Sequence, residues 1–184
     1  MRIVAGKFRG KALLSPTDES IRPTSDRARE AMFNILASRI GVNLDGLKVL
    51  DLFAGTGALG LEALSRGASG AVFVDIGAEA RGIIRDHIEA FGAGGIAKLL
   101  RRDATELGVA GTMGPFDLVF LDPPYGKGLG EKALVSLAAG NWLAKDATIV
   151  LEEGAEVTLD LPPGFEVNDR REYGAAAVHF IQQI

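Results

Sequence analysis

Hydrophobic and amphipathic segments alternate through the middle of the chain, and this alternation is the strongest constraint on its fold. Five apolar runs have the length of buried strands, at residues 47–52, 71–75, 96–101, 116–121 and 147–152. Three segments have helical spacing, at residues 58–66, 78–91 and 129–139. Strands that alternate with helices in this way form a parallel sheet with helices on both faces. We therefore expect a doubly wound α/β fold.

The N-terminal part of the chain adds a basic extension to this core. Residues 2–14 alternate loosely and contain two glycines, which predicts a short β-hairpin, and Thr24 or Ser25 can cap a helix that runs to about residue 39. Residues 1–39 hold eight Lys and Arg against four Asp and Glu, a net charge of +4, whereas the other 145 residues carry −8. This asymmetry predicts a contact with a polyanion, with a solvated charged face as the alternative.

The C-terminal part predicts two further strands. Residues 166–173 and 175–181 read as a hairpin that brings an antiparallel strand into the sheet. The sequence contains no repeat and no interdomain linker. We expect one domain over residues 1–184, with residues 1–40 as the extension and residues 41–184 as the core.

The motif Asp122-Pro-Pro-Tyr125 directly follows an apolar run. Two prolines cannot continue a strand, because neither has an N–H group for the ladder. The chain therefore leaves the sheet at a carboxyl end, where open α/β sheets bind ligands. A carboxylate and a backbone carbonyl can accept hydrogen bonds from an exocyclic amine, and a tyrosine ring can stack on a planar base. The motif predicts a site for a base amine; a Pro-rich turn with an exposed tyrosine is the alternative.

A glycine-rich loop joins the first core strand to its helix. In Asp51-Leu-Phe-Ala-Gly55-Thr-Gly57-Ala-Leu-Gly60, the first two glycines let the backbone approach a ligand closely. Asp75 ends the next strand, where an acid that binds ribose hydroxyls belongs. This spacing fits a dinucleotide as well as S-adenosylmethionine. Asp51 favours S-adenosylmethionine, because a carboxylate repels pyrophosphate and suits an ammonium and a sulfonium group.

Other residues carry weaker signals. Asp103 follows the third strand and could accept the adenine amine, with the Ala104 N–H group against the ring; a capping role for Asp103 is the alternative. The acidic pair Glu152-Glu153 ends a strand, and we expect it to be solvated or to rim the site.

The chain has no cysteine, which excludes disulfides, iron–sulfur clusters and Cys-ligated zinc. With only two histidines we expect no metal site. The lack of cysteine also argues against methylation of carbon 5 of a pyrimidine, which normally uses a thiol nucleophile. No apolar run approaches the length of a membrane span, and the N-terminus lacks the apolar core of a signal peptide, so we expect a cytoplasmic protein.

These residues together resemble the class I amino-methyltransferases that use S-adenosylmethionine. More narrowly, three segments resemble the bacterial 16S ribosomal RNA guanine-N2 methyltransferases, which modify guanine 966: Arg2-Ile-Val-Ala-Gly-Lys-Phe-Arg-Gly10, Arg22-Pro-Thr-Ser-Asp-Arg-Ala-Arg-Glu-Ala-Met-Phe-Asn34 and Gly57-Ala-Leu-Gly-Leu-Glu-Ala-Leu-Ser-Arg-Gly67. The resemblance covers nearly the whole chain. Family members usually carry Glu at the ribose position and another acid two residues on, whereas this chain has Asp75 and Gly77.

The resemblance implies a Rossmann-like fold with a mostly parallel seven-stranded sheet, direct methyl transfer to guanine N2, and RNA contact from the N-terminal hairpin. Taken with the residue chemistry, it gives three expected sets. The catalytic set is Asp122, Pro123, Pro124 and Tyr125. The cofactor set is Thr24, Asp51, Phe53, Ala54, Gly55, Gly57, Asp75, Asp103, Ala104 and Asp122. The RNA-binding set is Arg2, Lys7, Arg9, Lys11, Arg22 and Arg27.

We expect the partner to be 16S ribosomal RNA, within a small ribosomal subunit or an assembly intermediate, and the protein to act as a monomer. Three alternatives stay open. A DNA adenine-N6 or cytosine-N4 methyltransferase shares the Asp-Pro-Pro-Tyr motif but usually needs a target-recognition region, for which 184 residues leave little room. A dinucleotide-dependent oxidoreductase fits the glycine spacing, and a non-enzymatic RNA-binding module fits the basic extension.

Overall fold

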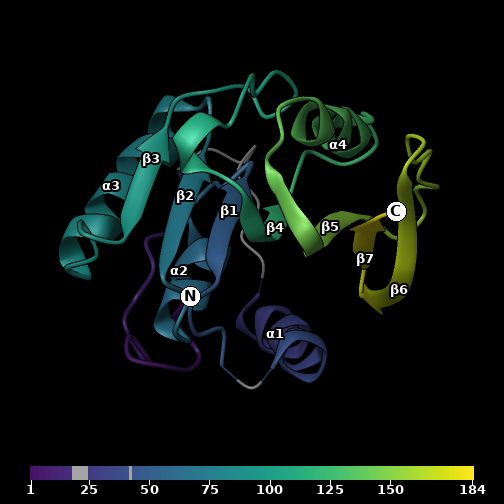
Figure 1. Ribbon diagram of the computed structural model, residues 1–184. Helices are drawn as coiled ribbons and strands as arrows, with labels where there is room; N and C mark the ends of the chain where they lie inside the picture. Colours follow the sequence, from purple (N-terminus) through teal and green to yellow (C-terminus); the bar gives the residue numbers. More distant parts are fainter. Residues whose placement is uncertain (18–24, 42) are drawn as a thin grey trace.

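The computed structural model describes residues 1–17, 25–41 and 43–184. These residues form a seven-stranded sheet with helices on both faces, as Figure 1 shows. In chain order the elements are α1 (Asp26–Ile40), β1 (Lys48–Leu52), α2 (Ala58–Ser65), β2 (Gly70–Val74), α3 (Ala78–Ala90), β3 (Ala97–Leu100), the 3-10 helix η1 (Gly111–Met113), β4 (Phe116–Leu121), α4 (Leu129–Ala139), β5 (Leu143–Gly154), β6 (Phe165–Tyr173) and β7 (Ala176–Gln183).

The strand order is β3-β2-β1-β4-β5-β7-β6. The first five strands of this order are parallel, and the hairpin of β6 and β7 pairs antiparallel with β5 through β7. The predicted fold class is confirmed. Strand β5 begins four residues before the apolar run that predicted it, because Leu143 already pairs with Phe116 ahead of a break in register. The polar residues Lys145 and Asp146 at this break are exposed and hide the start of the strand in the sequence pattern.

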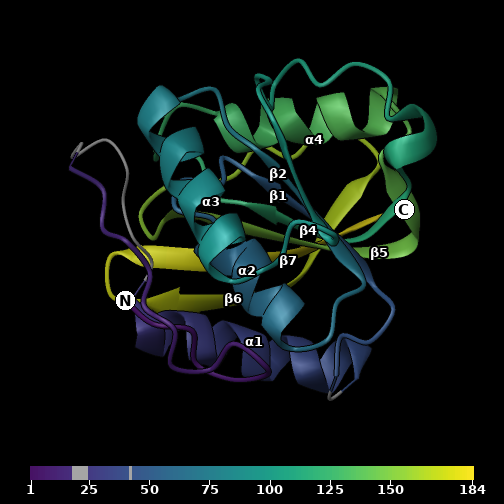
Figure 2. The same ribbon diagram turned by 90° about the vertical axis from the view of Figure 1, so that its left-hand side faces the viewer.

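Two hydrophobic cores lie on opposite faces of the sheet. Successive strand residues point to opposite faces, so Val49, Phe73 and Phe120 belong to one core and Leu50, Val74 and Leu121 to the other. The first core takes its helical residues from α1, α2 and α3, and the second takes them from α4. Figure 2 shows α4 and α1 on opposite sides of the sheet.

The expected N-terminal hairpin forms in part, with one antiparallel bridge between Arg2 and Ala12 and backbone hydrogen bonds across its two arms. Four backbone N–H groups between the arms go to α2 instead. Val4 and Ala5 donate to the two carboxylate oxygens of Glu62, at 2.9 and 3.1 Å. Glu62 is fully buried and also accepts hydrogen bonds from buried Arg29 and from Arg66, so it fixes the extension to the first core.

The extension then follows α3. The Phe8 ring lies 5.2 Å from the Phe91 ring, just past the end of α3, in a tilted arrangement. The Leu14 N–H group donates to His87, and the Thr17 N–H group donates to Glu79 near the start of α3. The capping prediction is met by Ser25, whose side chain accepts a hydrogen bond from the Ala28 N–H group at 3.1 Å. In the part of the chain that the structure describes, no helix is long and apolar enough to cross a membrane.

Candidate active site

Three aspartates lie at the carboxyl ends of neighbouring strands. Asp51 in β1 stands in register with Phe73 of β2 and Phe120 of β4, so these three side chains share one face of the sheet. Asp75 and Asp122 lie two residues beyond these phenylalanines, and the strand period of two places them on the same face. The carboxylates therefore lie together where the sequence predicts, at the edge of the sheet formed by the carboxyl ends of its parallel strands, from which α2 and α3 begin.

Asp51 is a buried carboxyl group at this edge. Only 1% of it is exposed, and the Gly60 N–H group donates to its Oδ2 at 3.0 Å. Burial raises the pKa of Asp51 to about 8, and the neighbouring charge of Asp75 adds to the shift. A cation bound beside Asp51 would stabilise its ionised form. Gly60 must be glycine, since a Cβ there would lie 2.4 Å from the Phe73 ring.

The glycine loop turns sharply between β1 and α2. Phe53, Gly55 and Gly57 all have positive φ angles, of 53°, 59° and 78°. For Phe53 this conformation costs on the order of 1–3 kcal/mol, a strain that often accompanies ligand-binding loops. Asp75 holds the loop, because its Oδ2 accepts a hydrogen bond from the Gly55 N–H group at 2.9 Å and its Oδ1 accepts one from Gly77 at 2.8 Å. Each carboxylate oxygen has a second lone pair for a ribose hydroxyl.

Asp103 makes a local contact within a turn, and no helix begins there for it to cap. The backbone N–H group and the hydroxyl of Thr105 both donate to Oδ1, at 2.8 and 2.7 Å, and these bonds lower the pKa of Asp103. Asp103 is exposed, whereas Ala104 beside it is buried. An adenine contact stays a prediction for both residues.

The Asp-Pro-Pro-Tyr segment folds back onto the end of β5. The Asp122 N–H group still bonds the Leu52 carbonyl of β1 at 3.4 Å, Pro123 is buried, and Pro124 is exposed. The Tyr125 hydroxyl then donates to Oε1 of Glu152 at 2.7 Å. The tyrosine ring lies against β5, because a Cβ on Gly154 would be 3.5 Å from it.

Two residues that the sequence underrated hold this segment. Glu153, which we expected to be solvated or at the rim, is only 1% exposed and accepts hydrogen bonds from the Gly126 and Gly154 N–H groups at 2.9 and 2.7 Å. Glu152 is partly buried and bonds Tyr125. Their position at the carboxyl end of the strand beside β4 was the available signal.

The arrangement fits S-adenosylmethionine. The Asp75 carboxylate above the glycine loop can take the ribose hydroxyls, and buried Asp51 suits the ammonium group. Ala54 is buried in the same loop, and Phe53 and Gly55 are partly exposed. Thr24 lies outside the described residues. Over residues 1–17, 25–41 and 43–184, no group of three or more His, Cys, Asp or Glu could hold a metal ion.

The predicted RNA-binding residues lie mainly at the other edge of the sheet, formed by the amino ends of its parallel strands. Arg2, Lys7, Arg9, Lys11 and Arg27 are exposed, and Arg22 falls outside the described residues. The Lys7 N–H group bonds the carbonyl of Ser65, the last residue of α2, at 2.8 Å, and the Lys11 ammonium lies over Phe91 just past α3. A helix of 13 residues such as α3 spans about 20 Å. The structure therefore separates Asp122 from the basic loop, the exposed segment that contains Lys7, Arg9 and Lys11.

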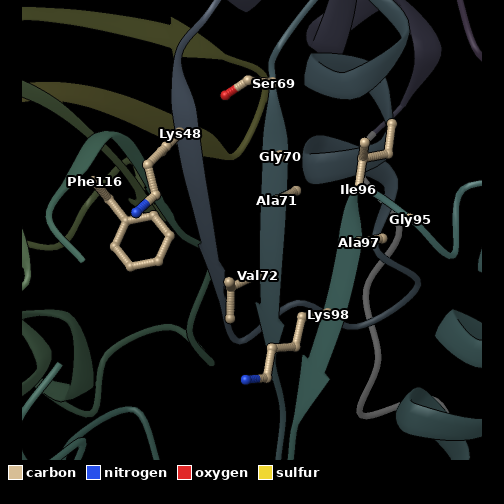
Figure 3. Close-up of a pocket in the computed structure, with 10 residues that line it drawn as sticks. All are labelled: Lys48, Ser69, Gly70, Ala71, Val72, Gly95, Ile96, Ala97, Lys98 and Phe116. Carbon is tan, nitrogen blue, oxygen red and sulfur yellow. The ribbon is translucent and has the colours of Figure 1, made fainter. Parts of the chain in front are cut away.

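A hollow of about 260 Å³ also lies at this other edge. It is formed where β1, β2, β3 and β4 begin, and Figure 3 shows the Lys48 ammonium against the Phe116 ring at its side. Its lining is Lys48, Ser69, Gly70, Ala71, Val72, Gly95, Ile96, Ala97, Lys98 and Phe116. None of the predicted cofactor or catalytic residues reaches it.

A sequence profile of the family described as "Conserved hypothetical protein 95" matches residues 1–182. The chain belongs to this family. It is 35% identical over 184 residues to ribosomal RNA small subunit methyltransferase D of Escherichia coli, covering 100% of this chain and 90% of that relative. The protein of the same name in Haemophilus influenzae is 31% identical over 184 residues, covering 99% and 93%.

Solved structures agree with this membership. The Escherichia coli protein yhhF matches with a TM-score of 0.83 and 30% identity, covering 100% of this chain and 97% of that one. A protein of Thermus thermophilus, TTHA0928, matches with a TM-score of 0.76 and 30% identity, covering 98% of each. The resemblance to this methyltransferase family and the Rossmann-like fold are confirmed.

Proposed function

We propose that this family member transfers a methyl group from S-adenosylmethionine to the exocyclic N2 of a guanine in 16S ribosomal RNA, at position 966. The observation that carries the proposal is the placement of Asp51, Asp75 and the Asp122–Tyr125 segment at one sheet edge. The names of the two sequence relatives support ribosomal RNA of the small subunit as the substrate. Guanine N2 is the finer part of the proposal and rests on the N-terminal motifs.

S-adenosylmethionine, when bound, supplies a methyl group on a positively charged sulfur, which an amine can take by direct displacement. The chain's own residues hold the amine. Asp122 and the Pro123 carbonyl accept hydrogen bonds from the NH2 group and orient its lone pair. Such positioning can lower the activation barrier by several kcal/mol. Asp122 or solvent takes the proton that the nitrogen loses.

Tyr125 stacks on the base, a contact worth roughly 1–3 kcal/mol. The target has to leave its stack to reach the sheet edge, which is easiest in an RNA loop. The hydrogen bond from Tyr125 to Glu152 fixes the ring before the base arrives. The ring therefore needs no reordering when it meets the base.

Rival functions explain less of the geometry. A dinucleotide pyrophosphate would meet the Asp51 carboxyl beneath the glycine loop. A non-enzymatic RNA-binding module would leave Asp51, Asp75 and Asp122 without a role, although they share one face of the sheet at the carboxyl ends of neighbouring strands. A DNA amino-methyltransferase would need a target-recognition region, whereas residues 41–184 would supply the catalytic core and residues 1–40 an extension fixed through Glu62.

The test is methyl labelling of naked 16S RNA and of small subunits, with the modified base mapped. We expect N2-methylguanosine at position 966. Asp122→Ala should abolish labelling while calorimetry still detects binding of S-adenosylhomocysteine. The control, Asp86→Ala, changes an exposed aspartate on α3 and should retain labelling. Methylation of adenine N6 or cytosine N4, binding of NAD in place of the methyl donor, or labelling by Asp122→Ala would overturn the proposal.

A further inference from the structure

We infer that Glu152 reads the N1–H group of the target base and thereby selects guanine over adenine and cytosine. The inference rests on the proposed function and deepens it. The motif Asp-Pro-Pro-Tyr recognises an exocyclic amine, which all three bases possess. The bases differ in the ring nitrogens beside that amine. Guanine has a donor, N1–H, on one side of the amine and a lone pair, N3, on the other, whereas adenine and cytosine have only a ring lone pair beside theirs. A second carboxylate beside Asp122 can read this difference.

The register of the sheet puts Glu152 in that place. Leu121 of β4 pairs with Leu151 of β5, and the next residue on each strand is an acid, Asp122 and Glu152. Neighbouring strands lie about 4.8 Å apart, and residues side by side in parallel strands point to the same face. Glu152 also pairs with Val178, a residue of the first core, which confirms that it shares the face of Asp51.

Glu152 is held in position. Its Oε1 accepts the Tyr125 hydroxyl at 2.7 Å, so the carboxylate and the predicted stacking ring are joined. Glu153, next in the chain and on the opposite face, fixes the segment through the Gly126 N–H group at 2.9 Å. A carboxylate offers about four lone-pair positions, so Glu152 can accept a base N–H in addition to the tyrosine hydroxyl.

The chemistry then separates the bases. With guanine stacked on Tyr125, Asp122 accepts from N2 and Glu152 accepts from N1, which are bonded to the same ring carbon. Adenine or cytosine, held by its amine at Asp122, would turn a ring lone pair toward the Glu152 carboxylate. That arrangement loses a charge-assisted hydrogen bond and adds a repulsion, so the wrong base is rejected as well as the right one favoured.

The test replaces one atom group of the substrate. RNA carrying 2,6-diaminopurine at the target keeps the N2 amine but has a lone pair at N1. It is compared with guanine in whichever substrate, naked RNA or small subunits, is labelled in the mapping experiment. We expect the wild-type protein to methylate guanine with a kcat/KM roughly 10- to 100-fold higher, the range for loss of one hydrogen bond to a charged group. Glu152→Gln should narrow this ratio to below about threefold, since its amide can donate to the N1 lone pair.

Two controls isolate the role of Glu152. Glu153→Gln makes the same change on the opposite face and should not alter the ratio. Calorimetry with S-adenosylhomocysteine checks that each variant is folded. Equal rates for the two bases with wild-type protein, or an unchanged ratio in Glu152→Gln, would overturn the inference while leaving guanine-N2 transfer intact. The wild-type comparison needs no variant, and mapping to another base would instead refute the proposed function.

Discussion

Nδ1 of His87 lies 2.8 Å from the carbonyl oxygen of Thr56 in the glycine loop. On the other side of the ring, the Leu14 N–H group donates to Nε2 at 2.8 Å. A backbone N–H can only donate and a carbonyl can only accept, so Nδ1 carries the hydrogen and the ring is neutral. A buried neutral histidine thus ties the N-terminal extension to the loop proposed to hold the cofactor.

This relationship predicts a loss of stability in mild acid. Burial lowers the pKa of both His87 and His179 below 6.5. As the pH falls below about 6.5, the unfolded chain takes up protons that the folded protein does not, so each histidine lowers the free energy of unfolding by up to about 1.4 kcal/mol per pH unit. The measurement is urea denaturation between about pH 7 and pH 5.

His87→Gln should flatten this dependence, because an amide can donate to Thr56 and accept from Leu14 without titrating. His87→Leu is the comparison: it also removes the titration but leaves the Thr56 carbonyl and the Leu14 N–H group unpaired. It should therefore cost more stability at pH 7 than the glutamine variant. Equal acid sensitivity of wild-type protein and His87→Gln would contradict the interpretation.

A second prediction concerns the pH dependence of cofactor binding. The pKa of Asp51 is raised to about 8, mainly by burial, so the cofactor-free protein carries it mostly protonated at neutral pH. A ligand with an ammonium group favours the ionised form. The affinity for S-adenosylhomocysteine should therefore rise with pH below about 8, by at most tenfold per pH unit, with release of a proton. Calorimetry in buffers of different ionisation enthalpy measures both.

5′-Methylthioadenosine is the matched ligand for this experiment, because it has the same nucleoside without the amino-acid part. Its affinity should change little over the same pH range. Asp51→Asn should weaken S-adenosylhomocysteine and remove the proton release. The same pH slope for both ligands would show that Asp51 does not face the ammonium group.

The sequence predicted where the three aspartates lie, but not the buried glutamates that hold the neighbouring segments. Asp51, Asp75 and Asp122 each lie at or near the end of an apolar run, and parallel strands bring such positions together, so their placement was predictable. Glu62 and Glu153 could not be predicted as buried, because burial of a carboxylate depends on its hydrogen-bond partners. The Val4 N–H group, which donates a hydrogen bond to Glu62, lies 58 residues away in the chain.

The N-terminal extension shows the same limit. Its loose alternation of apolar residues predicted strand pairing, and Ile3 and Leu13 are indeed in the first core. Four N–H groups between residues 4 and 8 instead meet acceptors on α2, including the Ser65 hydroxyl, which accepts from Phe8 at 2.9 Å, whereas Ile3 and Leu13 bond across the hairpin. Local pattern reports which side chains are apolar, whereas the partner of each backbone group depends on what packs beside it.

Gly6 and Gly10 provide a third prediction as a matched pair. Both have positive φ, of 87° and 84°, but a Cβ on Gly6 would lie 1.9 Å from the Ser65 carbonyl oxygen, whereas one on Gly10 meets nothing within 4 Å. Gly10→Ala should cost about 1–2 kcal/mol, the cost of a left-handed conformation. Gly6→Ala should cost clearly more, since the loop must lift off α2. Urea denaturation measures both, and equal losses would contradict the tight contact.

The last prediction follows from the distance between the basic loop and Asp122. Lys7 and Arg9 are exposed beside the end of α2, about one helix length from the carboxyl ends of the strands, where we propose that catalysis occurs. Replacing both with alanine should raise KM for RNA and leave kcat almost unchanged, because phosphate contacts position the substrate without touching the reacting base. The slope of log affinity against log salt should fall by about 0.7–0.9 per residue. Lys132→Ala with Lys145→Ala removes two exposed lysines outside the extension and should change neither quantity. Anisotropy titrations at several salt concentrations measure the slope; a fall in kcat with KM unchanged would show that the loop acts at the catalytic edge itself.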